Sequence, residues 1–390
     1  MCSSPVTPVR VDVAVVGAGF AGASVAIKAA QMGLSVRVFD ARPEYPGRFR
    51  ADKLEENQHG ILKQLSLDGL VRPVPSPFVE EVTIFQGRKA RVVPTGRQRG
   101  MDYQETVNSF RAFLGTLVPV EVTNVAGVRD GPDGCEITLG DGTVVSSRLG
   151  VMATGGSPMV RKSLGLPGQA AEAMLSTSFG FFAEPADGER FATDAFNAFP
   201  ARAVDGLQYV TFFPMGGRIR ANLFTCWDPS GDEARMLRAD PIGGLDRYFP
   251  HLTKHVGRIA LAGKLQVATT YYYRQPHQHL QSTVMIGDEY QSVSPATGMG
   301  ISKCTTDTRL LVDLLPKLKQ PGARIDLAGF YGHPDKIAVD EDARLSWAWS
   351  NEAVTSRSLR TRFKKFKIAV KETVGEERLA RLGLVRAEGA

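Results

Sequence analysis

The stretch VDVAVVGAGFAGASVAIKAAQMGLSVRVFD, residues 11–40, decides the fold. Its apolar, β-branched beginning, residues 11–16, is typical of a buried parallel strand. Gly17, Gly19 and Gly22 then form G-x-G-x-x-G where a strand passes into a helix. In such a loop the first glycine permits a tight turn, the second admits a pyrophosphate to the backbone, and the third lets helix and strand pack closely. The helix N-terminus then faces the anionic phosphates.

The rest of this stretch completes a strand–helix–strand unit. We predict a helix from about Phe20 to Met32 that ends at Gly33, and a second strand from Ser35 to Phe39. Asp40 follows this strand, at the place where an acid accepts hydrogen bonds from an adenosine ribose. Because all these features keep the expected spacing, we predict a dinucleotide site rather than a glycine-rich turn without a ligand.

The composition describes an ordinary globular chain, and 390 residues are enough for two or three lobes. No apolar run reaches the ~20 residues of a membrane span. Residues 1–10 lack the apolar core of a signal peptide, so we interpret them as a disordered tail of a cytoplasmic protein. The cysteines and histidines show no metal-ligand spacing, and we expect neither disulfides nor a metal site.

The net charge of +6 comes from one C-terminal segment. Residues 353–371 hold seven Lys or Arg residues and no acid, so the rest of the chain is close to neutral and we expect no nucleic-acid partner. Within residues 357–371, apolar side chains share one face of a basic helix. Such a helix can lie on an anionic membrane, but we expect it to pack on its own protein. We expect a monomer or a homodimer.

Two arginines follow the dinucleotide unit. Arg48 and Arg50 lie between a Pro/Gly loop and a segment, residues 51–67, with helical periodicity. Solvated surface charge is the simpler reading, but arginines beside a pyrophosphate site are well placed to bind its phosphates.

Several separate stretches of the chain resemble those of one known protein family. GRFRADKLEENQHGILKQLSL, residues 47–67, resembles the corresponding stretch of the single-component (class A) flavoprotein monooxygenases, the family of para-hydroxybenzoate hydroxylase. The resemblance recurs at MDYQETVNSF, residues 101–110, and at IGDEYQSVSPATGMGISKCTTDTRLL, residues 286–311. Residues 344–350, RLSWAWS, resemble the family's C-terminal helix.

This resemblance implies a cofactor and its contacts. FAD would be bound non-covalently, since the glycine loop has no Cys or His. The resemblance places Arg50 at the pyrophosphate, Gln104 at the flavin, and Gly287 with Asp288 at the ribityl chain. Pro295, Gly298 and Gly300 would form the loop that enters a helix beside the isoalloxazine.

The resemblance also implies the architecture: an α/β fold with a Rossmann-like FAD-binding domain of the GR2 type, an inserted antiparallel β-sheet substrate domain and C-terminal helices. We expect the FAD-binding domain in residues 11–78, 100–168 and 276–320. The substrate domain would comprise residues 79–99 and 169–275. A helical segment, residues 321–390, would complete the chain.

One position departs from the family pattern. The family usually shows Asp-Gly in a motif that ends S-x-x-R and is linked to FAD and NAD(P)H binding. This chain has Thr154 in place of the aspartate, although Arg161 fits the rest. FAD binding tolerates this change, whereas the use of nicotinamide is in question. A single dinucleotide fingerprint also implies that NAD(P)H visits only transiently.

Strand-like aromatic runs fill residues 169–275 and match the family's sheet over the flavin. Phe181, Tyr209, Phe212 and Tyr272 are candidates for an apolar substrate pocket, although aromatic residues at period two are more often plain core. The polar residues that hold para-hydroxybenzoate are not found here, so we expect a different substrate.

The resemblance thus implies an NAD(P)H- and O2-dependent monooxygenase of the kind found in secondary metabolism. It would hydroxylate or epoxidise a small, apolar, aromatic or natural-product-like molecule through a flavin C4a-hydroperoxide. The cofactor would perform the redox step, since no catalytic dyad stands out in the sequence. Three alternatives stay open: a flavin-dependent halogenase, a reductase of the geranylgeranyl type, and an FAD-binding maturation protein.

Overall fold

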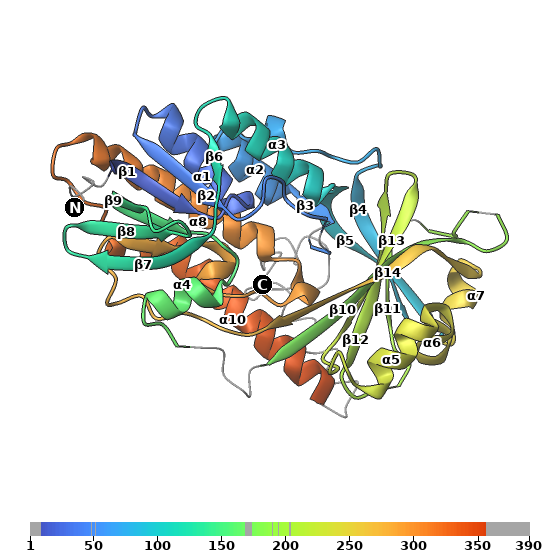
Figure 1. Cartoon of the computed structure of the whole chain (residues 1–390). Coiled ribbons are helices and arrows are strands. Elements are labelled where there is room, and N and C mark those ends of the chain that lie inside the picture. Colours follow the sequence, from blue (N-terminus) through green and yellow to red (C-terminus); the bar gives the residue numbers. More distant parts are fainter. Residues whose placement is uncertain are drawn as a thin grey trace, which may run out of the picture.

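The computed structural model describes residues 9–355, apart from residues 48, 51, 168–173, 189, 194 and 203. It has two lobes, each built on one sheet, with a long helix beside both (Figure 1). Arg48, residues 1–8 and the basic segment 357–371 lie outside the described residues, so the expectations for them stay predictions.

Sheet A, the sheet of the first lobe, has seven strands in the described chain, ordered β6-β2-β1-β9-β8-β7, with β15 also paired to β9. The bounds are β1 Val9–Val16, β2 Val36–Asp40, β6 Val120–Val122, β7 Val125–Gly131, β8 Gly134–Leu139, β9 Val144–Met152 and β15 Thr283–Met285. The pairs that join β6, β2, β1, β9 and β15 are parallel, whereas β7, β8 and β9 form an antiparallel meander. β1 begins two residues earlier than expected because its first residues already pair with β9.

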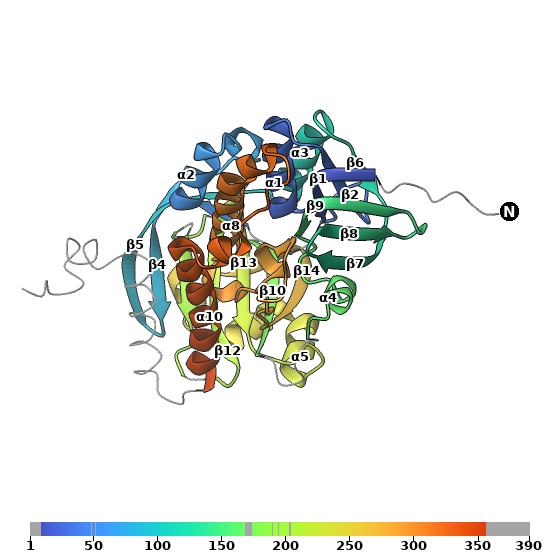
Figure 2. The same ribbon diagram turned by 90° about the vertical axis from the view of Figure 1, so that its left-hand side faces the viewer.

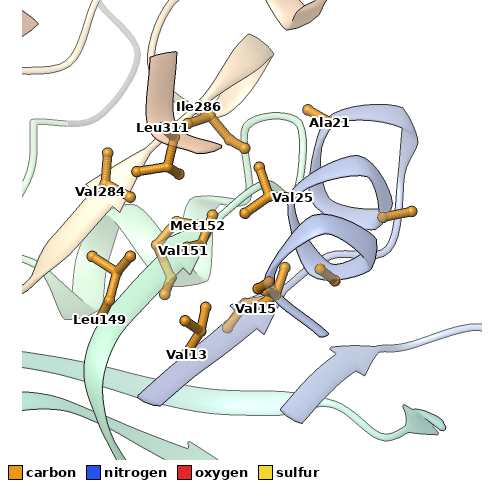
Figure 3. Close-up of a cluster of buried hydrophobic side chains, with 14 of the residues drawn as sticks. Val13, Val15, Ala21, Val25, Leu149, Val151, Met152, Val284, Ile286 and Leu311 are labelled. Carbon is orange, nitrogen blue, oxygen red and sulfur yellow. The ribbon is translucent and has the colours of Figure 1, made fainter. Parts of the chain in front are cut away.

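Helices α1 (Phe20–Gln31), α3 (Tyr103–Gly115) and α8 (Gly300–Leu314) pack together on this sheet. Figure 3 shows the core between them, where Val15 of β1 and Val151 of β9 lie with Val25 of α1 and Leu311 of α8. All four side chains are buried. The near-continuous apolar runs of β1 and β9 are what a strand covered by helices requires.

Sheet B, the sheet of the second lobe, has the order β14-β10-β13-β12-β11-β4-β5-β3 and is antiparallel except for the β4–β11 pair. The bounds are β3 Lys53–Glu55, β4 Val79–Gln86, β5 Lys89–Gly100, β10 Leu175–Pro185, β11 Phe196–Phe199, β12 Leu207–Met215, β13 Arg218–Thr225 and β14 Ile259–Tyr271. Helices α5 (Asp232–Ala239), α6 (Pro241–Tyr248) and α7 (Leu252–Val256) cover one face of it, and a second hydrophobic core lies between. The predicted α/β class, with a parallel-sheet lobe and an inserted antiparallel sheet, is confirmed.

The helix expected over residues 51–67 begins later than predicted. Lys53–Glu55 forms β3, which pairs with the end of β5, and only then does α2 (Glu56–Gln64) start. The change from strand to helix is fixed locally, because Glu55 and Gln58 form a capping box at the start of α2. The chain therefore touches sheet B immediately after the nucleotide unit.

Helix α10 (Pro334–Thr355) joins the two lobes. It packs against α8 of the first lobe and against β12 of sheet B (Figure 2). The short helices α4 (Pro158–Ser163) and α9 (Leu327–Tyr331) complete the helical elements that bear on the site. In the part of the chain that is described, no helix has the length and apolar character needed to cross a membrane.

Candidate functional site

The glycine loop has the geometry that the sequence predicts. Gly17 has a φ of +98°, and a Cβ there would lie 2.5 Å from the carbonyl oxygen of Ala153. A Cβ on Gly22 would collide with the carbonyl of Gly17. A Cβ on Gly19, in contrast, would meet no atom within 4 Å, so the backbone at the start of α1 stands open to an approaching group. The free N–H groups of that first turn suit an anion.

Asp40 lies beside this loop, at the end of β2. Its Oδ2 accepts a hydrogen bond from the Ala18 N–H (2.8 Å) and its Oδ1 accepts one from the Arg42 N–H (3.0 Å). The buried Arg111 of α3 lies 3.7 Å from Oδ2 and donates to the Arg42 carbonyl. The carboxylate is therefore held in place at the loop. No motif singles out Arg111, so it could not be predicted from the sequence.

Arg50 and Asp288, which are far apart in the chain, form an ion pair, with Arg50 Nη1 2.9 Å from Asp288 Oδ2. The nearby Asp288 raises the pKa of Arg50, which keeps its charge. Gly287 lies at the same place, because a Cβ there would be 3.7 Å from Cβ of Ala21 in the first turn of α1. The structure thus brings Arg50, Gly287 and Asp288 to the glycine loop.

Gln104, at the start of α3, lies against the loop that carries the two arginines. A Cβ on Gly47 would be 2.8 Å from Gln104 Oε1. The Gln104 side chain is exposed, so its amide is free to reach a ligand at this loop.

A buried carboxylate that the sequence did not single out binds Thr154. Glu289 Oε2 accepts hydrogen bonds from the Thr154 hydroxyl, from the Gly156 N–H (2.8 Å) and from the Ser157 N–H (3.2 Å). Glu289 is fully buried. The loop after β9 is therefore bound by the carboxylate of Glu289, which follows Asp288 in the chain. In the family pattern, an aspartate of the loop itself supplies a carboxylate at the position of Thr154. The only sign of this contact in the sequence is the second acidic residue, Glu289, directly after Gly287 and Asp288.

Arg161 also supports this loop. Its Nη2 donates to the Gly156 carbonyl (2.9 Å), and its guanidinium lies 5.0 Å from the ring centre of Tyr273. The Tyr273 hydroxyl in turn donates to the Asp288 carbonyl. These contacts tie the loop after β9 to the Gly-Asp turn.

Four buried charged side chains form a network that holds the Gly-Asp turn through the Gly287 N–H. Lys303 Nζ lies 2.6 Å from Asp340 Oδ1 and 3.3 Å from Asp307 Oδ2, and Lys336 Nζ lies 3.1 Å from Asp307 Oδ1 and 2.7 Å from Asp340 Oδ1. We call these four residues the buried quartet; all are at most 2% exposed. Asp307 Oδ2 also accepts the Gly287 N–H at 2.8 Å. Two cations and two anions balance, as a buried network requires.

The face of sheet B opposite α5–α7 is turned to residues 295–298. The Tyr209 hydroxyl donates to the Ala296 carbonyl at 2.6 Å, and Lys53 Cε lies 3.9 Å from the position a Cβ on Gly298 would take. Pro295 begins a single 3-10 turn, Gly298 has a φ of +70°, and Gly300 starts α8. The predicted isoalloxazine loop therefore lies opposite this sheet face.

Charged and polar side chains gather on that face; we call Asp52, Lys53, Arg220, Asn222 and Gln266 the platform. Arg220 Nε and Asn222 Nδ2 donate to Asp52 Oδ2 at 3.2 and 3.0 Å, and Arg220 Nη2 donates to Gln266 Oε1 at 2.6 Å. Lys53 Nζ donates to the Gln98 amide oxygen at 3.0 Å.

Gly180 makes room for the platform. A Cβ on this residue of β10 would lie 2.5 Å from the Phe49 ring and 2.6 Å from Arg220 Nη2. The Arg220 guanidinium lies 4.7 Å from the ring centre of Phe49 and 5.1 Å from that of Phe182. The alternation in RIRANLF, with Arg218, Arg220 and Asn222 on one face, was a signal for this polar face.

Two of the four pocket candidates are wrong. Phe181 and Phe212 are 1% exposed and belong to the core under α5–α7, because their strand positions point away from the platform face. Tyr209 lies on the platform side. Tyr272 packs edge-on against Trp347 of α10, with ring centres 6.0 Å apart, and stays a prediction.

The comparisons with known proteins bear on this geometry. Residues 15–63 match the model of an NAD(P)-binding Rossmann-like domain. No curated protein matches the sequence. Among solved structures, p-nitrophenol 4-monooxygenase PnpA from Pseudomonas putida DLL-E4 matches with a TM-score of 0.74 and 15% identity, over 98% of this chain and 100% of that one.

PqsL, a probable FAD-dependent monooxygenase from Pseudomonas aeruginosa, matches with a TM-score of 0.69 and 20% identity, over 92% of this chain and all of PqsL. The chain has the fold of the FAD-dependent monooxygenases. A geranylgeranyl bacteriochlorophyll reductase-like protein from Thermoplasma acidophilum has this fold too, with a TM-score of 0.64 and 16% identity over 96% of this chain and all of that one. So do a flavin-dependent brominase and a halogenase. At such identities the likeness establishes the fold and leaves the reaction open.

Proposed function

We propose that this chain is an FAD-dependent monooxygenase that uses NAD(P)H and O2 to oxygenate a small organic molecule. The observation that carries the proposal is the open backbone at Gly19, with the Arg50–Asp288 ion pair beside it. A pyrophosphate needs a helix N-terminus without a side chain in the way and a cation nearby, and this place has both. The shared fold supports the same reading.

In this proposal the first lobe binds FAD. The glycine loop of Gly17, Gly19 and Gly22 would face the pyrophosphate, with Arg50 and Arg48 as its cations. Asp40 and Asp288 would accept hydrogen bonds from the ribose and ribityl hydroxyls. The remaining contacts would come from Gln104, Gly287, Pro295, Gly298 and Gly300. When bound, FAD supplies the electron transfer from NAD(P)H and the reaction with oxygen.

The division of labour between the lobes follows from this assignment. Residues 11–78, 100–168 and 276–320 would hold the cofactor, with β3 as the point where the first of these segments joins sheet B. Residues 79–99 and 169–275 would cover it and hold the substrate. Sheet B would keep water from the reacting atoms. One PqsL structure is a complex with 2-aminobenzoylacetate, and this supports a small organic substrate here.

The test is an oxygen-labelling experiment on the full-length chain after saturation with FAD. We expect NAD(P)H consumption to be slow alone, to rise with an electron-rich aromatic substrate, and to place one oxygen atom from labelled O2 in the product. Failure to bind FAD would remove the whole proposal. Substrate-stimulated NAD(P)H consumption with a reduced alkene and no label would replace it by the reductase alternative, and halide-dependent substitution by the halogenase alternative. A chain that binds FAD but oxidises no NAD(P)H would fit a maturation protein.

A further inference from the structure

The loop after β9 lies between the two halves of the proposed cofactor site. On one side it packs on the glycine loop: the Ala153 N–H donates to the Val16 carbonyl at 2.8 Å, and a Cβ on Gly17 would lie 2.9 Å from Thr154 Cα. On the other side it meets the Gly-Asp turn, because β9 and β15 are parallel neighbours and the loops that follow them leave the sheet at the same edge. A side chain that holds this loop therefore holds the two halves of the site together.

Glu289 is the side chain that makes this contact. Its Oε2 accepts hydrogen bonds from the Thr154 hydroxyl and from the N–H groups of Gly156 and Ser157. Three donors on one oxygen suit an anion, and hydrogen bonds to a charged acceptor are roughly twice as strong as neutral ones. The residue before it is Asp288, the acceptor that the proposed function assigns to the ribityl chain. Glu289 thus ties that acceptor to the loop.

The surroundings of Glu289 indicate a role for its charge in the site. The side chain is fully buried, and its Oε1 has no hydrogen-bond partner among the described residues. A buried charge with an unpartnered oxygen loses hydration without full compensation, so stability alone does not account for it. Burial and the charges of Asp288 and Glu289 raise the pKa of Tyr273, whose hydroxyl therefore keeps its proton and donates to the Asp288 carbonyl.

We propose that Glu289 is a positioning residue for FAD, whose charge keeps the loop after β9 between the glycine loop and the Gly-Asp turn. The inference rests on the proposed function and adds a residue to it. When the loop leaves this place, Gly17 loses the backbone on which it packs, and Asp288 loses its link to the pyrophosphate side. The apparent dissociation constant for FAD then rises in inverse proportion to the fraction of molecules that keep the loop in place.

Position 154 allows the charge to be moved across this contact. The Thr154 hydroxyl already accepts the Ser157 N–H at 3.1 Å, so an aspartate there would reach the same donors from within the loop. Thr154→Asp together with Glu289→Gln exchanges the carboxylate and its hydrogen-bond donor between the two positions, with side chains of similar size. Thr154→Asp alone sets two carboxylates against each other in a buried place, which is unfavourable.

The test is fluorescence titration of FAD into the full-length chain freed of cofactor. Glu289→Gln should raise the dissociation constant about tenfold, because charge-assisted hydrogen bonds become neutral ones. Thr154→Asp should raise it at least as much. The double variant should return to within about threefold of the wild type, since the charge is restored on the other side of the contact. Urea unfolding of each protein measures any change in global stability separately.

Asp130→Asn is the matched control. Asp130 of β7 also holds two backbone N–H groups of a distant segment, those of Gln281 and Ser282, at 2.8 and 2.9 Å. These residues precede β15, at the end of the strand away from the Gly-Asp turn. The variant should lower the free energy of unfolding and leave the affinity for FAD unchanged.

Three results would overturn the inference: an unchanged affinity for FAD in Glu289→Gln, a double variant that binds no better than the weaker single variant, or an equal loss of affinity in Asp130→Asn. In each case a wild type that binds FAD leaves the proposed function standing, whereas a wild type that binds none removes both. If Glu289→Gln does not fold, the comparison of Thr154→Asp with the double variant decides, because Glu289→Gln can rescue FAD binding only if the two carboxylates meet at the site.

Discussion

The Arg50–Asp288 and Arg220–Asp52 ion pairs both join an arginine to an aspartate from a distant segment, yet they stand in different surroundings. Arg50 and Asp288 are 38% and 29% exposed and lie at an open stretch of backbone. Arg220 is 4% exposed, lies close to the rings of Phe49 and Phe182, and donates a hydrogen bond to Asp52. A half-exposed pair opens to a ligand at little expense, whereas a pair with one buried partner is part of the scaffold. The first pair is thus suited to exchange partners with a cofactor, as the proposed function requires, and the second to fix the side chains of the platform.

The largest effect should come from Gly19→Val, which breaks the cofactor side alone. Gly19 has a φ of −73° and a ψ of −172°, a conformation that valine adopts, so the fold should survive. The new side chain fills the space through which the phosphates approach, and the purified protein should be colourless after incubation with FAD. Gly115→Val, at an exposed helical glycine with nothing within 4 Å, should stay yellow. A yellow Gly19→Val protein would refute the placement of the pyrophosphate.

Arg220→Met should disrupt the Arg220–Asp52 pair on sheet B and lower the stability of the protein. It removes the cation under Asp52 and leaves a largely enclosed carboxylate without its main partner, at a loss of about 3 kcal/mol in the free energy of unfolding. Urea unfolding measures this. Arg258→Met, which breaks an exposed pair with Asp187, is the matched control and should change stability little. Equal effects of the two variants would mean that the platform pair is no more than a surface contact.

Asp288→Ala should weaken FAD binding and leave the stability of the fold nearly unchanged. Since Asp288 is half-exposed, unfolding should change little, while FAD loses one charge-assisted hydrogen bond. That bond is worth about 1.5 to 3 kcal/mol, so the dissociation constant for FAD should rise by about one to two decades. Fluorescence titration of FAD gives this value directly. Unchanged affinity in the folded variant would move Asp288 to a purely structural role.

The smallest effect is a difference in pH dependence between the partly buried Asp52 and the fully buried Asp307. Burial raises the pKa of Asp52, whereas at Asp307 the charges of Lys303 and Lys336 outweigh burial and lower the pKa. As the pH rises from about 3.9, the unfolded value, through the raised pKa of Asp52, the folded state binds more protons, so the wild type loses stability relative to Asp52→Asn.

For Asp307 the unfolded chain binds more protons between the lowered pKa and about 3.9. The wild type therefore gains stability relative to Asp307→Asn as the pH rises through that lower window. Urea unfolding of the three proteins in steps between about pH 3 and about pH 7 compares the two slopes. Slopes of the same sign would contradict the opposite surroundings of these two carboxylates.

The backbone geometry of the proposed cofactor site was predictable from the sequence because its parts are contiguous. Gly17, Gly19, Gly22 and Asp40 lie in one run, in which each residue's role follows from its spacing. The family resemblance assigned Arg50 and the Gly-Asp turn to different parts of FAD, and it did not predict the ion pair between them, since no spacing rule links residues so far apart in the chain.

The substrate side was not predictable, because it depends on which face each strand residue occupies. Phe181 and Phe212 are aromatic, as pocket residues often are. Alternate residues of a strand point to opposite faces of the sheet, and these two point into the core under α5–α7. Asp52 and Lys53 were assigned to a helix, and only the pairing of β3 with β5 brings them to sheet B. Glu289 could not be matched to Thr154 without knowing that the loops after β9 and β15 meet.

The buried quartet links the proposed nucleotide site to α10, a helix that is translated long after the glycine loop. Asp307 holds the Gly287 N–H, and Lys336 and Asp340 of α10 hold Asp307 and Lys303 in turn. The glycine loop leaves the ribosome first, and roughly 300 residues, or about 15 to 60 seconds of translation, pass before Asp340 follows. Until then the nascent chain displays the phosphate-binding half of the site without its fixed counterpart. Under the proposed function, the complete cofactor site therefore requires α10 as well as the segment that carries the fingerprint.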